Sequence, residues 1–268
     1  MALLQEAGKQ ALMVSFISKD DMQRELPKFA LDVRKAIVVI GGDGTVNAVV
    51  NAFNGILPVP LFIIPGGTGN DFYRMVYGGI HSLEKQVKSL LNGKVVRVDA
   101  GRSNGNFFVN CCGIGFEGMV AHDLQKKKFL LRGLFAYLAS VLYRMFFYKP
   151  PSYTVEYDGV RRRGSFYILT FGNGKWSGGG FPLAIKADIR DGLLDVVMFR
   201  DIRWWERLYY LLCVLSYRHI HRRKVEYGRL RRAKVFASFP TYAQLDGEVV
   251  KGRYFEIEVI PECIPLIV

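Results

Sequence analysis

Two glycine-rich loops, each directly after a short apolar run, constrain the fold of this 268-residue chain more than any other feature. The first, Gly41-Gly42-Asp43-Gly44, precedes a helix-like stretch that begins at Thr45, and the second spans Pro65–Asp71. Glycines let a backbone turn tightly and approach a ligand closely. A helix opening after such a loop offers N–H groups and a positive dipole end, which suits phosphate. One such loop is an ordinary strand-to-helix turn, but two on successive strands meet at one edge of a parallel sheet and predict a ligand site there.

The first half of the chain alternates apolar runs with helix-like stretches, up to about Val98. We expect strands at Ala11–Ser18, Ala36–Ile40 and Leu61–Ile64, and helices at Asp21–Val33, Thr45–Phe53 and Leu83–Leu91. Buried strands alternating with helices are typical of an open parallel α/β sheet covered on both faces. Residues 1–98 are therefore predicted to form a three-layer α/β domain.

After Asp99 the pattern changes to short β-rich runs separated by Gly- and Asp-rich turns. These runs are Phe107–Cys112, Tyr153–Tyr157, Phe166–Phe171, Leu194–Phe199, Lys234–Phe239 and Tyr254–Ile260. Their spacing is typical of an all-β sandwich or barrel, and we expect a β-sandwich over residues 99–268. Two segments interrupt it as helical insertions, Gln125–Tyr148 and Ile202–Arg223.

Charge and cysteine content narrow the function classes. The chain has 37 Lys and Arg against 24 Asp and Glu, a net charge of +13, which favours a polyanionic partner such as nucleic acid, an anionic membrane or a phosphorylated substrate. Four cysteines without a CxxC pair, and four histidines without an HExxH motif, argue against a disulfide scaffold or a zinc site and favour a reducing, cytoplasmic setting. The first ten residues hold no long apolar core behind a basic start, so we expect no secretory leader. The most apolar stretches, Gly133–Tyr148 and Leu208–Tyr217, are shorter than the roughly 20 residues of a membrane span.

Five motifs occur in a fixed order along nearly the whole chain. They are GGDGT at Gly41–Thr45, PGGTGNDF at Pro65–Phe72, FGNGKWSGGG at Phe171–Gly180, DGLLD at Asp191–Asp195 and LDGE at Leu245–Glu248. Together they resemble the diacylglycerol kinase catalytic family, in the small bacterial lipid-kinase form that also includes sphingosine kinases. A GxGxxG pattern at Gly113–Gly118 lacks the acidic residue that a dinucleotide site needs about 20 positions later, so we interpret it as a bend into a helix.

The resemblance implies an ATP-binding first domain, a lipid-substrate second domain and a role for particular residues. Gly41, Gly42, Asp43, Gly44, Thr45, Val46 and Asn47 would hold the nucleotide, with a further contact from Thr68. Asp43 would sit beside the phosphates and their Mg²⁺. Glu248 would accept the proton of the lipid hydroxyl, and Asp246 would share its metal–water network. Without the resemblance, Asp246-Gly247 would be an ordinary hairpin turn.

The resemblance also implies a second Mg²⁺ site, one that braces the β-domain. Its ligands correspond to Asp188, Asp191 and the backbone carbonyl of Leu193. Oxygen ligands from one carboxylate-rich loop suit a hard cation.

The basic runs lie next to aromatic segments and predict peripheral membrane binding. Examples are Lys126-Lys127-Lys128 before Phe129–Tyr148, and His219–Arg232 after Trp204-Trp205. Aromatic and cationic side chains together suit an anionic bilayer surface, which at the inner face of the membrane would present the lipid substrate of phospholipid biosynthesis. No motif supports nucleic acid as the partner.

The sequence leaves three interpretations open. The favoured one is an ATP- and Mg²⁺-dependent lipid kinase that acts on diacylglycerol, with a sphingoid base or phosphatidylglycerol as other acceptors. Small family members begin with a strand and an Asn-Pro-x-Ser-Gly loop, which this sequence lacks, so an N-terminally truncated, non-catalytic lipid- or nucleotide-binding protein is the second. Such an incomplete sheet would carry a bare edge strand, which favours a homodimer. An NAD kinase, which shares GGDGT, is the third and is disfavoured by PGGTGND.

Overall fold

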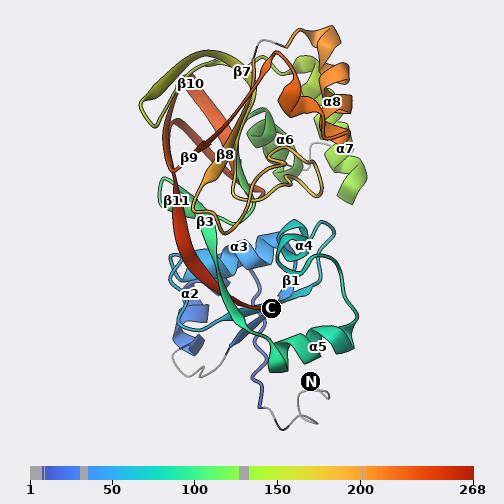
Figure 1. Cartoon of the computed structure of the whole chain (residues 1–268), viewed down its shortest axis with the longest axis vertical. Helices are drawn as coiled ribbons and strands as arrows, with labels where there is room; N and C mark the ends of the chain where they lie inside the picture. Colours follow the sequence, from blue (N-terminus) through green and yellow to red (C-terminus); the bar gives the residue numbers. More distant parts are fainter. Residues whose placement is uncertain (1–7, 9, 31–35, 127–132, 201) are drawn as a thin grey trace. The chain divides into compact units, whose positions relative to one another are not determined.

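The computed structural model describes residues 8, 10–30, 36–126, 133–200 and 202–268. The chain divides into two compact units, one made of Met1–Val98 with Glu262–Val268 and the other of Asp99–Pro261. Their helices and strands are drawn in Figure 1. The division after Val98 is where the sequence pattern changes, but the last residues of the long strand β11 (Glu248–Ile267) group with the first unit.

The first unit is an α/β fold built on parallel strands. It contains helices α2 (Lys19–Ala30), α3 (Asp43–Ala52), α4 (Asp71–Tyr77) and α5 (Leu83–Asn92), strands β1 (Ile37–Gly41) and β2 (Leu61–Pro65), and the start of β3 (Val95–Ser103). β1 pairs in parallel with β2 from Ile37 opposite Leu61 to Gly41 opposite Pro65, and β11 adds a parallel contact through Leu266. This places both glycine loops at the carboxyl ends of neighbouring strands, as the sequence predicts.

The core of this unit explains why its helices form where they do. Val46, Val49 and Val50 on one face of α3 are buried, as are Leu61, Phe62 and Ile63 on β2. Helix α3 packs against both β1 and α2. The predicted helix at Leu83–Leu91 is confirmed, and its N-terminus is capped by Ser82, whose side chain accepts the Lys85 N–H.

The strand predicted at Ala11–Ser18 is wrong. These residues have no regular structure, and Leu12, Met13 and Ile17 are exposed, Ile17 completely. Strand propensity reflects how a side chain fits a half-buried sheet surface, and this apolar stretch joins no strand ladder. β1 therefore ends the order of paired strands, and its outer edge is the one that the sequence analysis associated with a homodimer. The end of the predicted helix at Asp21–Val33 lies outside the described residues.

The second unit is the predicted β-sandwich. Its strands are β4 (Asn106–Phe108), β5 (Cys111–Gly115), β6 (Ser152–Tyr157), β7 (Val160–Gly172), β8 (Leu194–Arg200), β9 (Val225–Leu230), β10 (Arg232–Leu245) and most of β3 and β11. The long strands β7 and β10 each pair with β5 at one end and with β6 at the other. These strands share a hydrophobic core that includes Phe166, Phe171 and Phe255. The register of β10 against β11 shifts between Phe236 and Thr241, where Pro240 has no N–H to donate.

Helices cover one side of this sandwich. α7 (Gly133–Phe147) lies within the segment predicted as helical, Gln125–Tyr148, of which 127–132 are outside the described residues. α6 (Phe116–Gln125) ends where that segment begins and was not predicted. The second insertion contains η1 (Trp204–Glu206), α8 (Arg207–Leu215) and η2 (His219–His221). The Arg207 guanidinium donates to the carbonyls of Met145 and Tyr148, so the end of α7 is fixed to the start of α8. Among the described residues, no helix is both long and apolar enough to cross a membrane.

Candidate active site

The two glycine loops of the first unit contact each other backbone to backbone. The Gly66 N–H donates to the Gly41 carbonyl at 3.0 Å, which continues the ladder between β1 and β2. A Cβ built on Gly67 would lie 2.6 Å from the Cα of Gly42, and one on Gly42 would lie 2.9 Å from the Cα of Gly67. Real Cβ atoms do not come so close to backbone, so these glycines are needed for the loops to meet.

Asp43 joins the first loop to the helix that follows the second. Its carboxylate accepts the N–H of Asp71 at 3.1 Å and of Phe72 at 2.9 Å. Helix α4 begins at Asp71 and has no side-chain cap from its own N-cap residue, Asn70, whose amide instead bonds Gly67. Asp43 therefore supplies the cap from a position far back in the sequence, and it neutralises the positive end of α4.

The predicted nucleotide segment is only partly accessible. Gly41–Thr45 are half-buried, whereas Val46 and Asn47 are buried and the Asn47 carbonyl oxygens bond Asn51. The N-terminus of α3 has no side-chain hydrogen bond at its cap residue, Gly42. Thr68, in the second loop, is exposed. The accessible part is thus Gly41–Thr45 together with Thr68.

Lys19 was missed by the sequence analysis. It begins α2, and a Cβ built on Gly44 would lie 3.4 Å from its Nζ atom, which puts a cation beside the first loop. One indication of Lys19 is present in the sequence: it directly follows Ala11–Ser18, which was expected to be a strand, and loops after such strands bind ligands in this fold class. A cation at this place suits a phosphate ligand.

In the second unit, Asp246 organises a loop by binding backbone. Its carboxylate accepts the N–H groups of Val109, Asn110 and Cys111 at 2.6, 2.9 and 3.0 Å. The run predicted as one strand, Phe107–Cys112, is therefore split, because these donors bind a side chain instead of a neighbouring strand. β4 ends at Phe108 and β5 begins at Cys111.

A second Asp-Gly turn that joins two paired strands allows a comparison. Asp246 and Gly247 join β10 to β11 with φ of 48° and 92°, and Asp158 and Gly159 join β6 to β7 with φ of 45° and 77°. Both turns have the positive φ values of the common short hairpin. Asp158 is exposed, whereas Asp246 is half-buried and clamped to three N–H groups, so Asp246 is more than a solvated turn residue.

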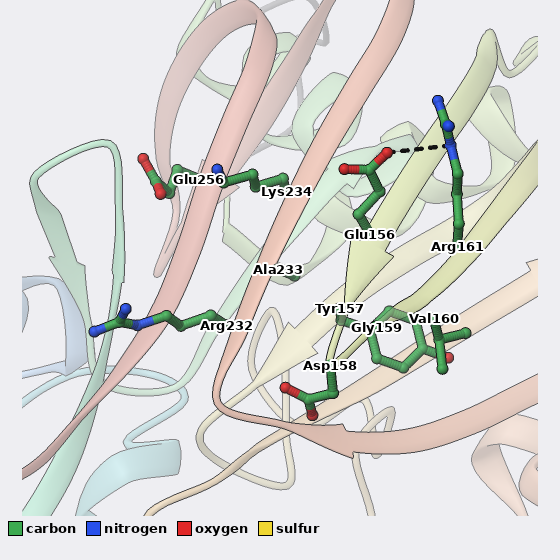
Figure 2. A pocket seen from close by; sticks show the side chains of 10 residues that line it. All are labelled: Glu156, Tyr157, Asp158, Gly159, Val160, Arg161, Arg232, Ala233, Lys234 and Glu256. Carbon is green, nitrogen blue, oxygen red and sulfur yellow. Dashed lines mark ion pairs between the residues drawn. The ribbon is translucent and has the colours of Figure 1, made fainter.

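The groove around the Asp158 turn has a volume of about 530 Å³ and is shown in Figure 2. It is lined by Glu156, Tyr157, Asp158, Gly159, Val160, Arg161, Arg232, Ala233, Lys234 and Glu256. Glu156 and Arg161 form an ion pair at 3.1 Å across the hairpin, and Lys234 stands opposite Glu156 and Glu256 on the neighbouring strands. None of the predicted site residues lines this groove, and its alternating charges are those of a solvated sheet face.

Glu248, the predicted base, is the first residue of β11 and is half-buried. It faces Leu245 across the hairpin. The turn between them is also held by Gln244, whose Oε1 atom accepts the Gly247 N–H at 2.8 Å. Gln244 was not identified from the sequence, although it stands beside the LDGE motif.

The DGLLD loop of the second unit brings Asp188, Asp191 and Leu193 close in one tight segment. The Asp188 carboxylate accepts the Arg190 N–H at 3.1 Å, and that of Asp191 accepts the Leu193 N–H at 3.0 Å. Arg229 lies 3.5 Å from Asp191. Among the described residues, no group of three or more His, Cys, Asp or Glu side chains has the arrangement of a metal site. A site here would need the Leu193 carbonyl, as the sequence analysis supposed.

Asp99, on β3, anchors this loop and was not identified from the sequence. It is fully buried, its carboxylate accepts the Gly192 N–H at 2.8 Å, and its own N–H donates to the Ile189 carbonyl. Burial also raises the pKa of Asp195, the last residue of the motif, to about 6. The loop is thus fixed from inside the unit by a carboxylate that comes almost a hundred positions earlier in the chain.

The predicted residues therefore form three groups. Gly41–Asn47 and Thr68 lie together in the first unit, Asp246 and Glu248 share one turn in the second, and Asp188, Asp191 and Leu193 share one loop of the second. Residues 1–103 match the diacylglycerol kinase catalytic domain, and residues 110–268 match the YegS C-terminal NAD kinase beta sandwich-like domain. The chain belongs to the diacylglycerol kinase family.

Members of the diacylglycerol kinase family match this chain over most of their length. A diacylglycerol kinase of Bacillus subtilis is 29% identical over 251 residues, which cover 91% of this chain and 81% of the relative. A Yersinia enterocolitica protein named Probable lipid kinase YegS-like is 30% identical over 254 residues, 91% of this chain and 82% of that protein.

Solved structures show the same diacylglycerol kinase fold. A diacylglycerol kinase from Bacillus anthracis superposes with a TM-score of 0.69 at 21% identity, covering 95% of this chain and 83% of that one. An NAD kinase from Archaeoglobus fulgidus in complex with ATP gives a TM-score of 0.57 at 15% identity, covering 100% and 87%. At these identities the likeness is one of fold alone.

Proposed function

We propose that this protein is an ATP-dependent lipid kinase that phosphorylates diacylglycerol to phosphatidate. The observation that carries the proposal is the LDGE turn, in which a carboxylate clamped to backbone fixes the residue that would act as base. Membership of the diacylglycerol kinase family, with relatives named as lipid kinases, supports the reaction class. A solvated Asp-Gly hairpin such as Asp158-Gly159 has no comparable anchor.

The first unit would hold ATP. The start of α3 presents backbone N–H groups after Gly42, and the positive end of the helix dipole there suits a phosphate. Thr68 would contribute a hydroxyl from the second loop, and Lys19 a charge beside Gly44. Asp43 would act near the phosphates while it holds the start of α4.

Glu248 would serve as the general base. Its carboxylate would take the proton of the lipid hydroxyl as the hydroxyl oxygen forms a bond to the γ-phosphorus of ATP. The bond from that phosphorus to the bridging oxygen breaks, and ADP leaves with the electron pair. Asp246 would keep the turn rigid, so Glu248 need not reorganise during the reaction.

Mg²⁺ would be needed in two places. Bound with ATP it neutralises charge on the phosphates. In the DGLLD loop, the carboxylates of Asp188 and Asp191 and the Leu193 carbonyl offer the all-oxygen ligand set that a hard cation prefers, and their N–H contacts already fix both carboxylates. A cation held by these oxygens would stabilise the second unit.

The helices α7 and α8 would dock the enzyme on an anionic membrane. Their exposed apolar side chains include Phe135, Phe146, Phe147, Leu208 and Leu212, with Trp204 and Trp205 on the adjoining η1. Exposed basic residues flank them, namely Lys149, Arg203, Arg218 and Arg223. Aromatic and basic side chains in one region suit a bilayer interface without insertion.

The test is transfer of labelled γ-phosphate from ATP in mixed micelles with Mg²⁺, offering diacylglycerol, a sphingoid base or phosphatidylglycerol. We expect labelled phosphatidate from diacylglycerol. Glu248→Gln should fold and bind ATP but lose turnover by about a hundredfold or more. Product from another lipid would reassign the substrate. No product from any lipid, by a folded chain, would support the non-catalytic interpretation instead.

The Mg²⁺ site in the DGLLD loop has a separate test that does not need activity. The melting temperature of the wild-type chain should rise with Mg²⁺ concentration in the absence of ATP, since a ligand that binds only the folded state stabilises it. Asp191→Ala should remove this rise. An unchanged melting temperature across Mg²⁺ concentrations in the wild type would exclude the site.

A further inference from the structure

The glycine pattern at Gly113–Gly118, interpreted above as a bend into a helix, makes room for the carboxylate of Glu117, a half-buried residue. A Cβ built on Gly113 would lie 2.4 Å from the Cδ atom of Glu117, so a larger residue at position 113 would displace this carboxylate. Gly115 has a φ of 87° and turns the chain from β5 into α6. Gly118 lets α6 pack on β10, because a Cβ there would lie 2.2 Å from the Tyr242 carbonyl oxygen. All three glycines bring Glu117 against the backbone of the sandwich.

Glu117 is held by three donors. The hydroxyl of Thr170 donates to its Oε1 atom, and Oε2 accepts the Ser177 hydroxyl at 2.6 Å and the Gln244 amide at 3.3 Å. Burial raises the pKa of the Glu117 carboxyl, while the Ser177 and Thr170 hydrogen bonds favour its ionised form. The carboxylate is therefore a fixed point within the second unit.

Gln244 connects this fixed point to the LDGE turn. It is 5% exposed, and it stands directly opposite Gly113 in the pairing of β10 with β5. Its Nε2 atom donates to Glu117 and to the Cys111 Sγ at 3.2 Å, while its Oε1 atom accepts the Gly247 N–H at 2.8 Å. Both ends of one amide are thus engaged, one with Glu117 and the other with the residue that precedes Glu248.

We infer that Gln244 and Glu117 are positioning residues for Glu248, which rests on the proposed function of Glu248 as the base. Glu117 fixes the orientation of the Gln244 amide, and Gln244 fixes the Gly247 peptide. The turn has two residues, Asp246 and Gly247. Asp246 is restrained by its hydrogen bonds with the backbone of Val109–Cys111, and Gly247 is restrained by Gln244. A general base acts only within hydrogen-bond reach of its proton, so a loosened turn lowers kcat more than substrate affinity.

The test uses four variants of the full chain. Gln244→Leu removes both bonds of the amide, and Gln244→Glu keeps the acceptor for Gly247 but sets a second carboxylate against Glu117. The double variant Glu117→Gln/Gln244→Glu exchanges amide and carboxylate, so that residue 117 donates to residue 244. The matched control is Gln86→Leu, which removes another buried glutamine, one that donates to the His81 carbonyl in the first unit.

Two quantities are measured, hydrogen exchange of the Gly247 amide by NMR and steady-state kinetics with ATP and lipid. We expect Gln244→Leu and Gln244→Glu to lower kcat about tenfold or more, with the KM for ATP within twofold. Gln244→Leu should also raise the Gly247 exchange rate about tenfold. The exchanged pair should recover much of kcat, a coupling that a purely structural role would not give. Gln86→Leu should change neither quantity.

The outcomes separate this inference from the proposed function. An active wild type whose kcat is unchanged in the folded single variants, or is not recovered by the exchanged pair, overturns the positioning role alone. Unchanged Gly247 exchange in Gln244→Leu does the same without any assay of turnover. A wild type that is inactive toward every lipid overturns the proposed function itself. If Gln244→Leu does not fold, Gln244→Glu and the exchanged pair still decide the kinetic question.

Discussion

The two units build their loops in opposite ways. In the first unit, the loops after β1 and β2 meet through glycine backbone, with Gly42 against Gly67 and no side chain between them. In the second unit, the segment Val109–Cys111 is held by the carboxylate of Asp246, which accepts all three of its N–H groups. One loop depends on the absence of side chains, and the other depends on the presence of one.

This difference teaches which substitutions each region tolerates. A glycine contact fails when an atom is added, because the backbone on the other side is not flexible. A carboxylate clamp fails when atoms are removed, because buried N–H groups lose their acceptor. Asp43 lies between these two cases. It belongs to the first unit, whose loops meet through glycines, but its carboxylate binds backbone N–H groups at the start of α4.

The largest effect is expected for Asp246→Ala. Three N–H groups would lose their acceptor, so the free energy of unfolding should fall by about 3–5 kcal/mol. The measurement is chemical denaturation of the chain without ligands. The matched control is Asp158→Ala, which places alanine in the same turn conformation at an exposed site. Both variants share the strain of a positive φ, so equal losses would show that the clamp contributes nothing.

Gly67→Ala should have the next largest effect. The new Cβ would meet the Gly42 Cα at 2.6 Å and the Asn70 Oδ1 at 3.0 Å, which forces the loops apart. We expect a loss of about 1–3 kcal/mol in unfolding free energy together with weaker ATP binding, measured by calorimetry. Gly164→Ala is the control, because its Cβ would have no neighbour closer than 4.0 Å. If the Gly67→Ala chain were as stable as this control, the close contact between Gly42 and Gly67 would not be needed for stability.

The sequence could predict the glycine loops after β1 and β2 better than the segment Val109–Cys111 that Asp246 holds. Glycine loops after apolar runs are local patterns, and the structure has them at the ends of β1 and β2. The partner of Asp246 lies 135 to 137 positions away, so nothing near Phe107–Cys112 indicated that this run would be split. For the same reason Asp99 and the link from Glu117 to Gln244 escaped notice.

Local pattern also failed where a strand needs a partner. Ala11–Ser18 has the apolar composition of a strand, but composition does not provide a neighbouring backbone to pair with. The helices at Thr45–Phe53 and Leu83–Leu91 were predicted closely, since the amphipathic period lies within the segment itself and the cap Ser82 is next to it, whereas α4 and α6 were not predicted.

Asp43→Asn tests the intermediate case and should have a smaller effect. The amide keeps one acceptor for the start of α4 but turns an NH₂ group toward the other N–H and loses the charge. A decrease of about 1 kcal/mol in unfolding free energy is expected without nucleotide. Asp158→Asn should be neutral on the same scale. A decrease as large as that of Asp246→Ala would show that the first unit depends on the Asp43 carboxylate as strongly as the second unit depends on Asp246.

The smallest effect on stability is expected for Lys19→Met. Its ammonium lies beside Gly44, yet Lys19 itself is exposed, so unfolding free energy should change by less than about 0.5 kcal/mol. If the cation serves a phosphate, the KM for ATP should rise a few-fold while KM for lipid stays constant. Lys28→Met, on the last turn of the same helix, is the control. Equal ATP KM values in the two variants would exclude Lys19 from the nucleotide site.

The return of β11 to the first unit has a consequence for the order in which the molecule can assemble. Leu266 pairs with Leu61, the Ile267 carbonyl accepts the Tyr77 hydroxyl at 2.9 Å, and Lys94 exchanges two backbone bonds with Val268. Domains of a growing chain usually fold in sequence, the N-terminal one first. Here the first unit emerges from the ribosome early but receives its closing strand only after the whole second unit has been synthesised. The second unit, which begins to fold later, can therefore complete its fold before the first unit does.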